Sequence, residues 1–316
     1  MAKDGDTQDD PAAVNVNAAA TEITDTQKAI NVANTPVSGS ILKVGADKDG
    51  AETENLEGVV FNLKPAGSSD SFAAVGLAAF IAAGGTQNAD GSIELTTGTD
   101  GTADIPKALL ISGNSYTLTE ASLGNNVEYR LPGSDKNYIT FSVDALGKFT
   151  ITGGNTSLYS MQGTDAEPRI KTINEPLLLR IKKTDRDYPD TVVSGAEMSL
   201  QRLKDIDGND VNEAAAAWTT STDNEGWQVF APASSGFSLQ TGFYELKETS
   251  EPDGYNSNDE SLYFWIGQDG LITWASADGT RSGTPSTSEY TMYTDEEATT
   301  ALRILLMAKR EALKYR

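Results

Sequence analysis

The strongest constraint on the fold is a repeat that divides the chain into two similar halves. In both copies an asparagine is followed nine residues later by a lysine, and a Tyr-x-Leu-x-Glu run comes further on. The positions are Asn34, Lys43 and Glu120 in the first copy and Asn174, Lys183 and Glu248 in the second. The asparagines and the lysines each repeat at an interval of 140 residues. Such a repeat predicts two tandem domains of one fold.

Short runs typical of β-strands fill both copies. They lie at 59–64, 115–120, 138–143, 148–152, 242–248 and 261–267. Turn-forming sequences separate them, and we expect hairpins at 47–50, 99–102, 205–210, 222–226 and 268–271. A helix fits the sequence in only three places, 72–83, 211–217 and 295–315. Many short strands with Gly and Asp turns predict an all-β protein built from sandwiches.

Three segments follow from the repeat. Residues 1–36 are expected to form a flexible acidic arm that carries an orphan strand ending at Asn34, because they have few large apolar side chains. Residues 37–176 and 177–316 are expected to form the two β-sandwiches. The first contains an insertion at 68–95, whose apolar part is either a helix that covers a sheet edge or a ligand-contacting excursion. The covering role is the favoured interpretation.

Composition excludes several classes of function. The formal net charge is −22, so the chain repels the phosphate backbone, and nucleic-acid binding is not expected. The chain has no histidine and no cysteine, which removes the commonest general base, thiol nucleophiles, disulfides and structural zinc. No apolar stretch reaches the roughly 18 residues that a membrane span needs. We therefore expect no multiple-turnover enzyme, no cofactor and no metal site.

The order of motifs resembles the Cna B-type domain of Gram-positive pilins and wall-anchored surface adhesins. The first copy contains GSILKVGADKDG, NLEGVVFNL, TDGTADIPKALLISGNSYTLTE and RIKTIN; the second contains LRIKKTDRD, VSGAEMSLQRL, STDNEGWQVFAP and GFYELKETSEPDGY. The resemblance covers about residues 37–310. It implies inverse immunoglobulin-like sandwiches that serve as rigid stalk modules, and an autocatalytic Lys–Asn or Lys–Asp isopeptide bond promoted by a buried glutamate.

The residues of the first copy fit that chemistry. Burial disfavours the ammonium form of a lysine, and only the neutral amine is a nucleophile. A buried, protonated glutamate can polarise a carboxamide and move protons while ammonia leaves. We assign Lys43 as nucleophile, Asn174 as electrophile and Glu120 as proton shuttle. The alternative is that Lys43 and Glu120 face solvent and Asn174 caps a turn, as such residues usually do.

The second copy departs from the pattern. Lys183 and Glu248 are present, but aligning LRILLMA with RIKTIN places Ala308 where the first copy has Asn174. An alanine methyl cannot accept an amine, so either the second crosslink is absent, or the alanine is an engineered block, or the partner comes from elsewhere. The segment also fits a helix, although a strand is favoured. The boldest hypothesis is a crosslink between Lys183 and Asn34 of another molecule.

Two functions fit these observations. The first is a structural stalk or shaft segment of a Gram-positive pilus or wall-anchored adhesin, at the extracellular cell surface, whose partners are neighbouring pilin or stalk domains. The second is an adhesive module that recognises a host extracellular-matrix protein or glycan. Trp218, Trp227, Trp265 and Trp274 could form a carbohydrate platform, and the Asp-Gly runs could hold calcium, but core packing and plain turns are favoured. Asn34 resembles the closing asparagine of a preceding domain, and the next lysine of the repeat would fall at position 317, so the chain is interpreted as an internal part of a longer array; neither a signal peptide nor a sorting signal is found.

Overall fold

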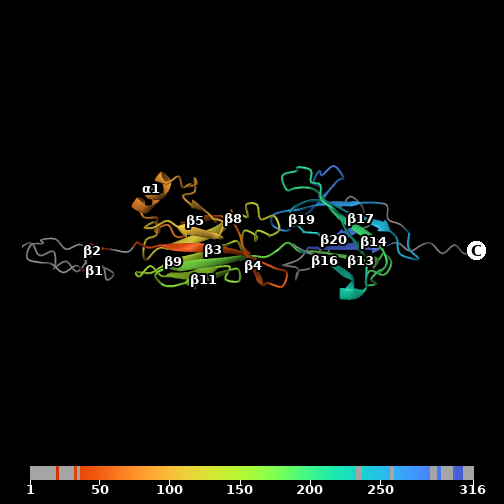
Figure 1. Cartoon of the computed structure of the whole chain (residues 1–316), viewed down its shortest axis with the longest axis horizontal. Helices are drawn as coiled ribbons and strands as arrows, with labels where there is room; N and C mark the ends of the chain where they lie inside the picture. The colour runs from red at the N-terminus through yellow and green to blue at the C-terminus, as the bar shows by residue number, and fades with distance from the viewer. Residues whose placement is uncertain are drawn as a thin grey trace, which may run out of the picture.

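A computed structural model shows an all-β protein, as the sequence predicts. It describes residues 36–232, 237–256 and 260–284, together with the backbone of four strands: β1 (Ala19–Ala20), β2 (Val32–Ala33), β20 (Tyr290–Met292) and β21 (Leu302–Ala308). Strands β1 and β2 pair antiparallel. Asn34 and most of the expected arm lie outside the described residues. Figure 1 shows two sandwiches that follow one another along the long axis of the molecule.

The first sandwich consists of two sheets that face each other. One sheet has five strands, in the spatial order β10 (Phe149–Gly154), β9 (Tyr138–Val143), β8 (Ser115–Ser122), β5 (Val60–Pro65) and β6 (Ile93–Thr96). The other contains β11 (Tyr159–Gly163), β12 (Pro168–Asn174), β3 (Gly39–Ala46) and β4 (Glu52–Asn55), and β7 (Thr102–Ile105) also pairs with β3.

The second sandwich repeats this plan with fewer strands. One sheet has the spatial order β16 (Trp227–Phe230), β13 (Leu179–Asp185), β21 and β20. The other has the order β15 (Ala216–Thr219), β14 (Glu197–Lys204), β17 (Gly242–Ser250), β18 (Leu262–Ile266) and β19 (Ile272–Ala275). A single turn of 3₁₀-helix, η2 (Asp223–Gly226), precedes β16.

The feature that positions the candidate site is the pairing of the first and last strands of each sandwich. Strand β3 pairs with β12 in parallel, and β13 pairs with β21 in the same way. Nearly the whole sandwich lies between such strands in sequence, so their contact is a long-range closure of the domain. Residues on these two strands that face inward therefore meet in the core, next to the opposite sheet.

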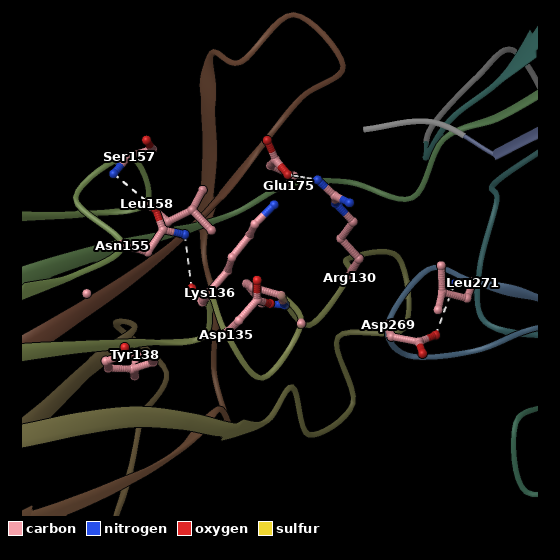
Figure 2. Close-up of a pocket in the computed structure, with 13 residues that line it drawn as sticks. Arg130, Asp135, Lys136, Tyr138, Asn155, Ser157, Leu158, Glu175, Asp269 and Leu271 are labelled. Carbon is pink, nitrogen blue, oxygen red and sulfur yellow. Dashed lines mark hydrogen bonds and ion pairs between the residues drawn. The ribbon is translucent and has the colours of Figure 1, made fainter. Parts of the chain in front are cut away.

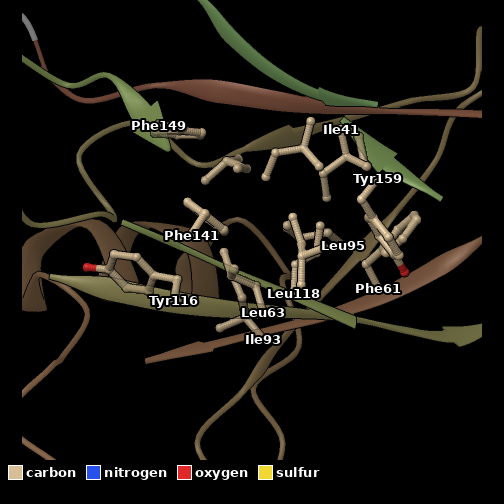
Figure 3. Packing of buried hydrophobic residues seen from close by; sticks show 14 of the residues in the cluster. Ile41, Phe61, Leu63, Ile93, Leu95, Tyr116, Leu118, Phe141, Phe149 and Tyr159 are labelled. Carbon is tan, nitrogen blue, oxygen red and sulfur yellow. The ribbon is translucent and has the colours of Figure 1, made fainter. Parts of the chain in front are cut away.

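Alternating apolar residues on the inner faces form the core of the first sandwich. Ile41 on β3, Phe61 and Leu63 on β5, and Phe141 on β9 are fully buried, and Figure 3 shows them interdigitating. The second sandwich has a separate core around Leu200, Leu246 and Phe264. Burying such side chains stabilises a fold by about 1.5–3 kcal/mol each. Each sandwich therefore has the apolar core that it needs.

Two sequence predictions are wrong in the structure. The turns at 99–102 and 222–226 join β6 to β7 and β15 to β16, which belong to different sheets, so they are crossings between sheets and not hairpins. The helix expected at 211–217 is absent, because Ala216 and Ala217 pair with β14 as strand residues. The favoured strand near the C-terminus is confirmed over Leu302–Ala308.

The helix expected at 72–83 is confirmed as α1 (Ala74–Ala82). It lies at the end of the first sandwich that is farther from the second (Figure 1). Leu77 and Phe80 pack against the core. A Cβ atom at Gly76 would lie 2.3 Å from the carbonyl oxygen of Ala108, so glycine allows the helix to approach this segment closely. Covering is thus the role that the packing supports.

Backbone hydrogen bonds join the two sandwiches. The loop between β8 and β9 donates from Leu131 N–H to the carbonyl of Gln268 at 2.7 Å and accepts at Val127 from Thr241 N–H at 2.8 Å. The same loop is also hydrogen-bonded to the segment that connects the two sandwiches, because Leu177 N–H donates to the backbone carbonyl of Glu128 at 2.8 Å. Backbone hydrogen bonds therefore join the loop both to the connecting segment and to the second sandwich.

Candidate isopeptide site

Lys43 lies on the inner face of the first sandwich. Ile41 and Lys43 alternate with half-buried residues along β3, so the same pleat that buries the isoleucine buries the lysine. Its side chain is fully buried, as are those of Glu120 on β8 and Asn174 on β12. The prediction that these three residues face inward is confirmed, and the alternative of exposed side chains is excluded.

The three side chains are in mutual contact. Lys43 Nζ donates to Glu120 Oε2 at 2.9 Å and is in hydrogen-bonding contact with Asn174 Oδ1. Asn174 Nδ2 donates to Glu120 Oε1 at 2.9 Å. The glutamate thus bridges the amine and the carboxamide, one oxygen to each. This is the arrangement in which a single carboxyl group can pass a proton from the attacking nitrogen to the leaving one.

Further groups fix this geometry. Thr172, which stands opposite Lys43 in the parallel pair, accepts a hydrogen bond from Lys43 Nζ at 3.2 Å. The carbonyl of Arg130 accepts from Asn174 Nδ2 at 3.1 Å. Phe61 lies below the amine, with its ring centroid 5.8 Å from Nζ. The amine, carboxyl and carboxamide are therefore held in a buried, preorganised site.

Burial changes the protonation of Lys43. Desolvation lowers the pKa of the Lys43 amine from 10.5, and the Glu120 carboxylate opposes this by favouring the ammonium form. Desolvation prevails, so the neutral, nucleophilic amine is more accessible than in water. Burial and the nearby Glu120 raise the pKa of Tyr159 well above 10, so its hydroxyl stays neutral and donates to the carbonyl of Asn137 at 2.8 Å.

The second sandwich contains the same lysine and glutamate. Lys183 on β13 and Glu248 on β17 are 2% and 3% exposed, and Lys183 Nζ lies 3.1 Å from Glu248 Oε2. Lys183 also lines a surface pocket of about 280 Å³ between the edge strands β15 and β16. The amine is therefore buried beside its carboxylate, as in the first sandwich, but it borders an opening at the side of the sandwich.

Backbone register places Ala308 where the first sandwich has Asn174. On β12, Thr172 stands opposite Lys43 and Asn174 opposite Gly45. On β21, Leu306 stands opposite Lys183 and Ala308 opposite Asp185. The residue two positions beyond the partner of the lysine is an asparagine in one case and an alanine in the other. The register of the strands therefore agrees with the sequence alignment of Ala308 with Asn174.

Asp185 follows Lys183 by two residues on β13, and its carboxylate accepts hydrogen bonds from the turn that follows and from Tyr255. Oδ1 accepts from the backbone N–H groups of Asp187 at 2.8 Å and Tyr188 at 3.2 Å. Oδ2 accepts from the Tyr255 hydroxyl at 3.0 Å. These bonds explain Asp185 as a residue that holds the turn after β13.

The other candidate sites have structural explanations. Trp265 and Trp274 are each 7% exposed, and Trp218 packs edge-on against Phe230, so these side chains belong largely to the packed interior. The Asp205 carboxylate accepts from the backbone N–H groups of Asp207 and Asn209 at 3.0 and 2.8 Å, which closes a turn. Among the residues that the structure describes, no cluster of acidic side chains is placed to hold a metal ion, and no helix is long and apolar enough to cross a membrane.

A polar pocket of about 770 Å³ lies at the junction of the two sandwiches (Figure 2). Residues from both sandwiches line it, including Lys136, Tyr138, Asn155 and Leu271. Arg130 forms an ion pair with Glu175 at its wall. No sequence pattern indicates this pocket, since it depends on how the loop after β8 meets the second sandwich.

Sequence reasoning also missed Thr172 and Arg130 as neighbours of the reactive groups. Thr172 could have been found from the alternation Ile170, Thr172, Asn174, because residues two apart on a strand share a face. Arg130 acts through its backbone carbonyl, which carries no sequence signal.

Comparison with known families identifies the second sandwich. Residues 178–280 match the family described as SpaA, prealbumin-like fold domain. This stretch is a CnaB-type domain. The first sandwich has the same parallel closing strands and the same inward lysine and glutamate as this CnaB-type domain. The chain matches no curated protein.

Several solved structures are similar to the chain. A C-terminal fragment of the pilus adhesin SpaC from Lactobacillus rhamnosus GG has 17% identity and a TM-score of 0.39, over 87% of this chain and 98% of that one. The Bacillus anthracis TIE protein has 18% identity and a TM-score of 0.34, over 89% of this chain and 37% of that one. The shaft pilin spaA from Lactobacillus rhamnosus GG has 16% identity and a TM-score of 0.24, over 88% and 99%.

Proposed function

We propose that the chain is a stalk or shaft segment of a bacterial pilus or wall-anchored surface adhesin, stiffened by an isopeptide bond between Lys43 and Asn174. The observation that carries this proposal is the buried contact of Lys43, Glu120 and Asn174 between the first and last strands of a sandwich. The CnaB-type match of the second sandwich supports the same class of surface protein.

The reaction needs only these three side chains. The neutral Lys43 amine attacks Cγ of Asn174, and the bond between Nζ and Cγ forms. Glu120, which contacts both nitrogens, takes a proton from Nζ and gives one to Nδ2. The bond between Cγ and Nδ2 then breaks, and ammonia leaves. Each molecule reacts once, so the chain crosslinks itself and is not a multiple-turnover enzyme.

The bond would change how the domain carries tension. A pull along the chain enters the first sandwich at β3 and leaves it at β12, the two strands that the bond would join. Force would then pass directly from Lys43 to Asn174, and the segment between them would stay folded. This is the property that a stalk needs, and neighbouring stalk domains at the cell surface are the partners that it implies.

Intact mass tests the proposal. We expect the mass of the purified chain to be one ammonia below the value for its sequence, and Lys43→Ala, Asn174→Ala and Glu120→Ala to restore the full value. Lys171→Ala is a matched control, since Lys171 is on β12 but pairs with Glu52 outside this site. A wild-type mass without the loss would refute the crosslink.

The junction pocket supports a second candidate function, an adhesive module. Its volume of about 770 Å³ lies in the usual range for ligand sites, and such sites often occur between domains. The hydroxyl, amide and ammonium groups of Tyr138, Asn155 and Lys136 would suit a glycan or a polar peptide. Binding to a glycan panel and to matrix proteins that is lost in Tyr138→Ala/Lys136→Ala would establish it; binding unchanged by that variant would place the ligand elsewhere.

A further inference from the structure

The second sandwich holds a lysine–glutamate pair that its own chain leaves without an electrophile at the expected position. Lys183 and Glu248 are buried and 3.1 Å apart, and β21 presents Ala308 at the register position that Asn174 occupies on β12. A buried ion pair is costly to maintain, and an apolar pair of similar size would often serve stability better. The presence of this pair next to a strand that has alanine at the asparagine position therefore calls for a function.

The chain carries a second copy of the strand sequence that would complete this site. Residues 30–36 read INVANTP and residues 170–176 read IKTINEP, with isoleucine, asparagine and proline at the same spacing. The second of these is strand β12, whose asparagine contacts Lys43. The first is not needed by Lys43. Asn34 lies outside the described residues and enters this argument through its sequence alone.

We propose that Lys183 of one molecule forms an isopeptide bond with Asn34 of a second copy, whose residues 30–34 replace β21. In the register of β21, Asn34 takes the place of Ala308, Val32 stands opposite Lys183, and Ile30 stands opposite Ile181. The incoming strand thus has apolar or β-branched residues at the positions opposite the inward-facing residues of β13. Main-chain pairing of an added strand supplies the binding energy.

The chemistry is the same as in the proposed function, on which this inference rests. The bond between Lys183 Nζ and Asn34 Cγ forms, the bond between Asn34 Cγ and Nδ2 breaks, and Glu248 carries one proton from Nζ to the departing ammonia. Rare opening of β21 is sufficient, because local openings of a native protein recur continually. Each opening allows the strand of a second molecule to enter, and the covalent bond that then forms is not undone when other molecules close again. Repetition gives head-to-tail covalent chains.

The test is incubation of the concentrated full chain, followed by a denaturing gel and mass spectrometry. We expect a ladder of covalent multimers whose bonds each lack one ammonia, and a crosslinked peptide that contains Lys183 and Asn34. Asn34→Ala and Lys183→Ala should each give only monomer. A mixture of these two variants should give dimer and nothing larger, since one supplies only the asparagine and the other only the lysine.

Two further variants separate this inference from the proposed function. Lys43→Ala should lose the internal bond and keep the ladder, so the two reactions fail independently. Ala308→Asn should supply the electrophile within the same molecule, which gives a monomer lacking two ammonias and abolishes the ladder. A single wild-type monomer band, or a ladder that persists in Asn34→Ala, would overturn the inference, even if Ala308→Asn crosslinks internally.

Discussion

Under the proposed function, one position decides whether each of the two sandwiches can react with itself. Both bury a lysine on the first strand and a glutamate on the opposite sheet, and both close with a parallel last strand. The first then places Asn174 beside the amine, whereas the second has Ala308 at that position. The comparison teaches that the parallel closure of this fold does not depend on an asparagine at this position, since β21 pairs with β13 although it has Ala308 there.

Mechanical extension should separate the two sandwiches most clearly. When a single molecule is pulled from its ends, we expect the second sandwich to unfold and the first to stay folded, because a bond at Lys43 and Asn174 bypasses the residues between them. Lys183 and Ala308 are 125 residues apart, so unfolding should release roughly 400 Å of chain. Two unfolding steps of similar length in the wild-type chain would contradict the comparison.

Asn174→Ala should remove most of the stability difference between the sandwiches. The bond would close a loop spanning 131 residues, which the chain-entropy relation used for disulfides values at about 5 kcal/mol. Calorimetry should show the wild-type second sandwich melting first, and the transition of the first sandwich falling in the variant. Unchanged transitions in Asn174→Ala would mean that no bond constrains the first sandwich.

Ala308→Asn should also reduce the stability difference between the sandwiches, in this case by stabilising the second one. If Lys183 and Glu248 retain the reactivity of Lys43 and Glu120, the new asparagine closes a loop of similar length and adds up to about 5 kcal/mol to the second sandwich. Ala308→Ser is the matched control, because a hydroxyl adds polarity without an electrophilic carbon. A melting temperature that rises equally in both variants would point to packing instead of a bond.

Gly45→Ala should test a second difference between equivalent positions. Gly45 and Asp185 each follow their lysine by two residues, but a Cβ atom at Gly45 would lie 2.3 Å from the Tyr129 hydroxyl oxygen. Tyr129 would have to move and lose its bonds to Thr53 and Glu54, both at 3.0 Å. We expect a loss of about 1–3 kcal/mol in the free energy of unfolding. A neutral effect would show that Tyr129 relocates freely.

The smallest expected effect concerns pH. In Asn174→Ala the Lys43 amine stays free, and burial lowers its pKa from 10.5 in the folded state. Between the lowered pKa and 10.5 the unfolded chain binds a proton that the folded chain does not, so stability rises with pH. The slope is at most about 1.4 kcal/mol per pH unit and vanishes above 10.5. Denaturant titrations across this range should show the rise, and Lys43→Met/Asn174→Ala should lack it.

Much of the site can be predicted from the sequence because its parts repeat in an order that resembles Cna B-type domains. The repeat and that resemblance together single out Lys43, Glu120 and Asn174, and these residues meet because alternation along β3, β8 and β12 turns all three inward. The alignment of Ala308 with Asn174 depended on the same alternation, and the register of β21 confirms it. The period of two along a strand specifies which face of the sheet a side chain occupies, so the sequence is sufficient to predict which side chains point into the core.

Features that depend on distant partners could not be predicted. A turn sequence such as 99–102 specifies a local reversal, but not whether the next strand stays in the same sheet, so the hairpin expected there is wrong. The alanines near 216 favour helix in isolation, yet pairing with β14 overrides that propensity. The contact of Asn174 with the Arg130 carbonyl arises from the path of a loop, which no local pattern encodes.

The hydrogen bonds at the junction have a consequence for rotation about the long axis. Two of them, from Leu131 to Gln268 and from Thr241 to Val127, connect the loop after β8 to separate loops of the second sandwich. Two attachment points away from the covalent connection resist twisting, whereas a single connecting segment would act as a swivel. The relative azimuth of successive sandwiches is thereby set, so a longer array of such units would display equivalent faces at a regular angular step.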